Sequence, residues 1–160
     1  MSTIQLTTRI KAPIERCFML SLSVDLHTKS TEGTQERAVA GVTRGIMGLN
    51  DTVTWEARHF GIKQKLTTRI SAYSSPNYFV SEMVKGAFKK IHHQHIFHRA
   101  GEETIMTDIF AFEAPMGLLG RAAEKIFLKN YMEKFLVKRN ATIKALAESG
   151  EWIDYLKTPG

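Results

Sequence analysis

A succession of strand-like segments that ends in one long helical segment is the feature that most constrains this chain. Six segments carry the alternation or the β-branched and aromatic residues typical of strands: residues 36–40, 52–59, 63–73, 78–85, 87–98 and 103–113. Short turns rich in Gly, Asn, Asp and Ser separate most of them. Turns this short join antiparallel neighbours, so we expect a meander rather than parallel strands linked by helices.

A further strand and two short helices are expected ahead of this meander. Residues 3–11 alternate apolar Ile4, Leu6 and Ile10 with polar neighbours, which predicts a first strand. Residues 13–23 place apolar side chains at helical spacing behind Pro13, a residue suited to a first helical turn. Asp25 is expected to cap a second short helical turn, and the polar residues 28–34 are expected to form a loop.

The last long segment, residues 118–149, contains no proline and is dominated by good helix formers. At about 1.5 Å per residue it is about 48 Å long, and its apolar residues shift from one side to another, as in a helix that is largely enclosed. A sheet must bury one face, and this helix is the element able to cover it. We therefore predict one α+β domain over residues 1–160, with a gap between sheet and helix where a ligand would bind.

Composition indicates a cytoplasmic globular protein. The chain is 43% hydrophobic and 24% charged, as in ordinary globular domains, and no apolar run approaches the ~20 residues that span a bilayer. The N-terminus lacks the apolar core of a signal peptide. The single cysteine, Cys17, lies on the apolar side of its predicted helix, which indicates a buried, inert thiol in a reducing compartment.

The net charge of +6 does not indicate a nucleic-acid partner. The basic residues are scattered over the sequence, with no basic stripe, tail or nucleic-acid motif. We expect solvated surface charge, with at most a weak, salt-sensitive contact with anionic membrane surfaces. No motif indicates an oligomeric state.

Two histidines in the segment 87–98 are the most informative polar residues. Alternation places His93 and His95 on one strand face, in a row that begins with Ile91 and ends with Phe97. Buried imidazoles need hydrogen-bond partners, so this face either meets water or lines a cavity. Asp108 lies in a similar apolar row on the next strand, where we expect it either to have a histidine or Arg58 as partner or to be neutral.

A metal site is the alternative for these histidines. A His-x-His pair on a strand places two imidazoles about 6.6 Å apart on one face, a spacing usable for joint ligation. A catalytic zinc site needs a third ligand, which Asp108 or Glu82 would have to supply, and the sequence does not bring them together. We favour a hydrogen-bonded pair that lines the cavity, and we expect no metal and no cofactor.

The segment 52–59 has two possible orientations. If the face that carries Trp55 and His59 is inward, these two residues line the cavity and Arg58 is a surface residue. In the opposite orientation, Arg58 would anchor an anionic group of the ligand. Periodicity alone leaves this open.

Several short motifs resemble those of one known superfamily. They are APIERCF at residues 12–18, WEARHFG at 55–61, HQH at 93–95, Thr107-Asp108, and APMGLLG at 114–120. With the order of elements, they resemble the START-like, or SRPBCC, superfamily and a bacterial ligand-binding branch of it. Birch-pollen-allergen-type proteins, lipid-transfer domains and polyketide cyclases belong to this superfamily. The resemblance implies a helix-grip fold, a curved antiparallel sheet of about seven strands around a long C-terminal helix.

The leading expectation is a carrier or sensor of a small, mostly hydrophobic molecule such as a lipid, polyketide or aromatic compound. The residues predicted to bind it are Trp55, His59, Met83, Ile91, His93, His95, Phe97, Met106, Asp108, Phe110 and Ile126. One alternative is an enzyme of the cyclase or dehydrase type, which would use His93, His95 and Asp108 for acid–base chemistry without a metal. Another is a protein-interaction module that uses the final helix or the tail with Trp152 and Tyr155.

Overall fold

The computed structural model describes residues 1–59, 61–114 and 122–156, leaving out the side chains of residues 122–124. Its seven strands form one antiparallel sheet in the order β1-β7-β6-β5-β4-β3-β2. The first strand pairs with the last, so β1 extends the meander at one end. The strands are β1 Ser2–Ile10, β2 Arg37–Gly41, β3 Thr52–His59, β4 Ile62–Ser74, β5 Tyr78–Lys85, β6 Lys90–Ala100 and β7 Glu103–Glu113.

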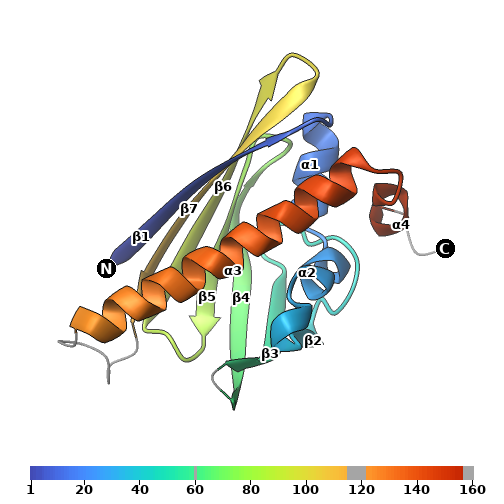
Figure 1. The fold of residues 1–160 in the computed structure, drawn as a ribbon. Coiled ribbons are helices and arrows are strands. Elements are labelled where there is room, and N and C mark those ends of the chain that lie inside the picture. The colour runs from blue at the N-terminus through green and yellow to red at the C-terminus, as the bar shows by residue number, and fades with distance from the viewer. Residues whose placement is uncertain (60, 115–121, 157–160) are drawn as a thin grey trace.

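A long helix lies across one face of this sheet, as Figure 1 shows. The helices are α1 Ile14–Ser21, α2 Val24–Ser30, a 3₁₀ turn Glu32–Thr34, α3 Ala122–Glu148 and α4 Trp152–Leu156. The predicted α+β fold class, with a curved sheet, short helices after the first strand and one long C-terminal helix, is confirmed. The predicted start of the long helix at residue 118 lies outside the described residues.

The predictions around α2 were wrong in two respects. Ser23 caps α2, because its hydroxyl accepts the backbone N–H of Leu26 at 3.1 Å. Asp25 instead accepts the backbone N–H of Gly45 at 2.9 Å, which ties the loop between β2 and β3 to α2. The predicted loop 28–34 is mostly helical, since residues 28–30 belong to α2 and residues 32–34 form the 3₁₀ turn. The hydroxyls of Thr28 and Ser30 are satisfied within α2, where they donate to carbonyls of their own helix.

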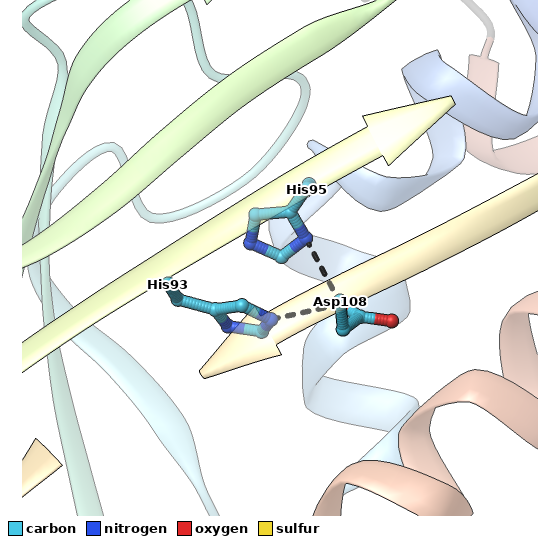
Figure 2. Close-up of side chains that lie close together, drawn as sticks. All are labelled: His93, His95 and Asp108. Carbon is cyan, nitrogen blue, oxygen red and sulfur yellow. Dashed lines mark hydrogen bonds and ion pairs between the residues drawn. The ribbon is translucent and has the colours of Figure 1, made fainter. Parts of the chain in front are cut away.

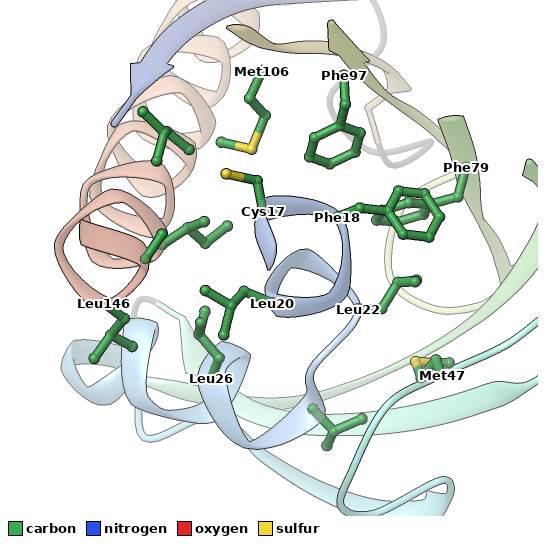
Figure 3. Packing of buried hydrophobic residues seen from close by; sticks show 14 of the residues in the cluster. Cys17, Phe18, Leu20, Leu22, Leu26, Met47, Phe79, Phe97, Met106 and Leu146 are labelled. Carbon is green, nitrogen blue, oxygen red and sulfur yellow. The ribbon is translucent and has the colours of Figure 1, made fainter. Parts of the chain in front are cut away.

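Helix α1 anchors the larger hydrophobic cluster (Figure 3). The ring of Phe18 packs edge-on against Tyr73, Phe79 and Phe97, with centroid separations of 5.4, 5.6 and 5.5 Å, a favoured aromatic geometry. Cys17 is fully buried in the same cluster, and burial raises the pKa of its thiol. This agrees with the predicted inert thiol.

The aromatic residues of the tail pack against the same cluster. Trp152 and Tyr155 of α4 are partly buried there, and the guanidinium of Arg16 lies 4.0 Å from the centre of the Trp152 ring, a cation–π contact. None of the helices in the described ranges is long and apolar enough to cross a membrane.

Candidate functional site

A cavity of about 320 Å³ lies between the sheet and α3. Most of its wall is apolar, with side chains from the inner faces of several strands, from α2 and the loop before β3, and from one side of α3. On α3 the lining residues are Leu128, Tyr131, Met132, Phe135, Leu136 and Arg139. The cavity therefore lies at the place where the predicted gap between sheet and helix was expected.

Six of the eleven predicted binding residues line this cavity: Trp55, His59, Ile91, His93, His95 and Phe110. Strand β3 has the face with Trp55 and His59 turned inward, which resolves the orientation that the sequence left open. Arg58 is exposed on the outer face. Glu56 also points outward, 2.9 Å from Arg37 and 3.2 Å from Lys63, and hydrogen bonds from these two residues lower its pKa.

The other five predicted residues lie elsewhere. Phe97 and Met106 point inward, but α1 covers that end of the sheet and they pack in the Phe18 cluster. Met83 packs against the second hydrophobic cluster, which contains Ile91 and Leu136. Ile126 is 63% exposed, because it lies on a side of α3 turned away from the sheet. Asp108 is fully buried and does not line the cavity itself, but it contacts His93 and His95, which do.

Asp108 is the centre of a polar cluster at the wall of the cavity. Its Oδ1 accepts a hydrogen bond from Nε2 of His93 at 2.8 Å, and its Oδ2 accepts one from Nδ2 of Asn140 at 2.7 Å. Nη1 of Arg139 lies 3.6 Å from Oδ1. The prediction of a histidine partner is confirmed, whereas the cation beside Asp108 is Arg139 rather than Arg58.

The second histidine is less well placed for hydrogen bonding. Nδ1 of His95 lies 3.4 Å from Oδ1 of Asp108, and this buried nitrogen has no hydrogen-bond partner among the described residues. Figure 2 shows that both imidazoles turn toward the same carboxylate. The His95 ring is stacked between His93 and Phe79, with centroids 3.7 and 4.0 Å away, so neighbouring rings hold it in place.

Burial and hydrogen bonding set the protonation states of this cluster. Burial lowers the pKa of His93 and places the pKa of His95 well below the ordinary value. Burial acts to raise the pKa of Asp108, but the hydrogen bond from His93, the close contact with His95 and the charge of Arg139 together outweigh it and hold that pKa well below the usual range. The cluster thus combines two neutral imidazoles, one carboxylate and the guanidinium of Arg139, with no net formal charge.

A second polar group lines the cavity where β3 faces α2 and α3. Nδ1 of His59 lies 2.6 Å from the hydroxyl of Tyr131. Nε2 of His27 lies 3.0 Å from Oε1 of Glu36, and the His27 ring lies 4.2 Å from the ring of Trp55. Burial lowers the pKa of His59 and raises that of Tyr131.

Sequence reasoning missed Arg139 and Asn140. Both are buried, yet the sequence places them in a lysine-rich part of the helix, where they resemble surface residues. The available signal was Asn140, because asparagine is a poor helix former in a helix interior and marks a position where a side-chain hydrogen bond is needed.

Comparisons with known proteins show similarity in structure. No protein-family model matches the chain, and no curated protein matches it in sequence. A solved structure from Thermus thermophilus matches with a TM-score of 0.70 at 17% identity, covering 91% of this chain and 99% of that one. Ginseng major latex-like protein 151 from Panax ginseng matches with a TM-score of 0.67 at 17% identity, covering 92% and 98%.

A START superfamily protein from Mycobacterium smegmatis also matches, with a TM-score of 0.67 at 12% identity, covering 90% of this chain and 98% of that one. At these identities the similarity concerns the fold alone. The chain has the helix-grip fold of the START-like superfamily, which the sequence motifs predicted.

Proposed function

We propose that this protein binds a small, largely apolar molecule in the cavity between the sheet and α3, as a carrier or sensor in the cytoplasm. The observation that carries the proposal is the cavity itself, whose volume of about 320 Å³ lies within the range of small-molecule sites. Burying about 300 Å² of apolar ligand surface would contribute about 7 kcal/mol. Association and ordering costs reduce this, so we expect a dissociation constant of about 10 µM or higher.

The polar groups in the wall would orient the ligand. His93, His95 and Arg139 line the cavity together, so a ligand with one polar end would place that end against them and its apolar part against Trp55 and Leu136. A medium-chain fatty acid has this form and is a suitable first probe.

The two tryptophans make a direct binding test possible. Trp55 lines the cavity, whereas Trp152 packs on α4 against Arg16. The Trp152→Phe variant therefore reports on Trp55 alone, and Trp55→Phe reports on Trp152. We expect bromododecanoic acid, whose bromine quenches tryptophan at short range, to quench Trp55 saturably and to leave Trp152 largely unquenched.

Unbrominated dodecanoic acid is the matched control. It should compete with the brominated acid without quenching. Quenching that never saturates, or equal quenching of both tryptophans, would show surface adsorption and would contradict the proposal.

A second candidate function is an acid–base enzyme acting on a molecule in the same cavity. The observation in its favour is the hydrogen bond between His93 and Asp108, because a carboxylate behind an imidazole can orient it for proton transfer. Such an enzyme would catalyse deuterium exchange next to the carbonyl of an aryl ketone such as tetralone, which NMR would detect. The exchange should be lost in His93→Gln and retained in His98→Gln.

A further inference from the structure

Two imidazoles and a carboxylate converge on one point beside the cavity. One ring nitrogen of His93, one of His95 and a carboxylate oxygen of Asp108 all lie within 4.8 Å of one another. Oδ1 of Asp108 is 2.8 Å from the first nitrogen and 3.4 Å from the second. In a tetrahedral site with bonds of about 2.0–2.1 Å, ligand atoms are about 3.3 Å apart. Small side-chain movements would therefore give all three groups a common metal ion.

Hydrogen bonding alone does not account for this arrangement. Nδ1 of His95 is buried without a hydrogen-bond partner in the described part of the chain, and an unsatisfied buried nitrogen destabilises the folded state. The ring is nevertheless held in this position by stacking on both sides. A metal bonded to Nδ1 would supply the missing partner.

The surroundings of Asp108 resemble the hydrogen-bonded shell that orients metal ligands. Asn140 donates to Oδ2 at 2.7 Å, which fixes the carboxylate and leaves Oδ1 directed at the two histidines. Arg139 donates to the amide oxygen of Asn140 at 3.0 Å, and this bond fixes the orientation of the amide. Glu82, the other third ligand considered from the sequence, lies 3.6 Å from His92, a residue on the opposite face of β6.

We propose that His93, His95 and Asp108 bind a divalent first-row transition metal such as Zn²⁺, with an open coordination position directed into the cavity. Two nitrogens and one oxygen favour Zn²⁺, Co²⁺ or Fe²⁺ over Mg²⁺ or Ca²⁺. Both histidines line the cavity, which gives the ion a route of entry. This inference replaces the metal-free cluster expected from the sequence, because the structure brings together the third ligand that the sequence could not place.

Arg139 defines the chemistry of the open position. Its guanidinium lines the cavity and lies 3.6 Å from Oδ1 of Asp108, so it opposes a bare dication and favours an anionic fourth ligand. If the cavity binds an apolar molecule, as we propose, that molecule carries a carboxylate or phenolate. This anionic group bonds the metal beside Arg139.

The test uses untagged full-length protein stripped with EDTA. After addition of Zn²⁺ and gel filtration, elemental analysis should find about one zinc per chain, and Co²⁺ should give the intense visible bands of a four-coordinate ion. His95→Gln and Asp108→Asn should each weaken binding about tenfold or more. His98→Gln is the matched control, because His98 is exposed on the other face of the same strand.

His95→Gln removes a nitrogen without a hydrogen-bond partner, so this variant should fold, and circular dichroism would check it. Loss of zinc in folded His95→Gln with retention in His98→Gln supports the proposal. Substoichiometric zinc in the parent protein, or equal binding by all variants, overturns it and leaves a hydrogen-bonded His–Asp cluster. Dodecanoic acid binding without zinc binding would refute only the metal site, whereas zinc binding without dodecanoic acid binding would refute the proposed function.

Discussion

At the scale of single residues, the carboxylate of Asp108 depends on partners from two elements, β6 and α3. Asn140 gives it a hydrogen bond at 2.7 Å in a fully buried position, and hydrogen bonds to charged groups contribute about 1.5–3 kcal/mol. We expect Asn140→Ala to lower the free energy of unfolding of the metal-free protein by about 2 kcal/mol, measured by urea denaturation. Thr142→Ala is the control, because its hydroxyl bonds only a helix carbonyl at the exposed side. Equal effects of both substitutions would contradict the role of Asn140.

The same cluster makes stability depend on pH. Burial places the pKa values of His93 and His95 below the ordinary value of about 6.5. Below that pH the unfolded chain binds protons that the folded chain does not. The free energy of unfolding of metal-free protein should therefore fall as the pH is lowered from about 6.5, by up to about 1.4 kcal/mol per pH unit for each histidine.

Urea denaturation at several pH values checks this slope. His95→Gln should reduce the slope, and the same substitution at exposed His98 controls for the loss of a histidine. A slope unchanged by His95→Gln would contradict the buried, neutral state of that imidazole.

At the scale of elements, α3 presents different sides to the cavity and to water. Leu136 is buried and lines the cavity, whereas its neighbour Val137 is 51% exposed. Leu136→Trp should fill part of the cavity and weaken dodecanoic acid binding about tenfold or more in isothermal titration calorimetry, because overpacking displaces the ligand. Val137→Trp should leave the affinity within about twofold, since surface substitutions rarely exceed about 0.5 kcal/mol. Equal affinities of the two variants would place the ligand elsewhere.

Some of the strands and helices could be predicted from the sequence, and others could not. Strands β3, β5 and β7 have the bounds that alternation and turn residues predicted, because period-two burial leaves a strong pattern. The prediction of a loop at the end of α2 was wrong. It was based on polar residues such as Thr28 and Ser30, whose hydroxyls donate to carbonyls of their own helix. The pairing of Asp108 with Arg139 and Asn140 was beyond prediction, because it depends on the register of α3 against β7.

In the whole molecule, the sheet and α3 enclose the cavity in which we propose that the ligand binds. A crystal structure of the protein with bromododecanoic acid tests this proposal most directly, because the anomalous signal of bromine locates the ligand independently of the density for its chain. We expect one bromine peak inside the cavity, in contact with the apolar wall around Trp55 and Leu136, and the carboxylate near Arg139. Bromine found only on the outer surface, with the cavity free of the acid at saturating concentration, would contradict the proposal.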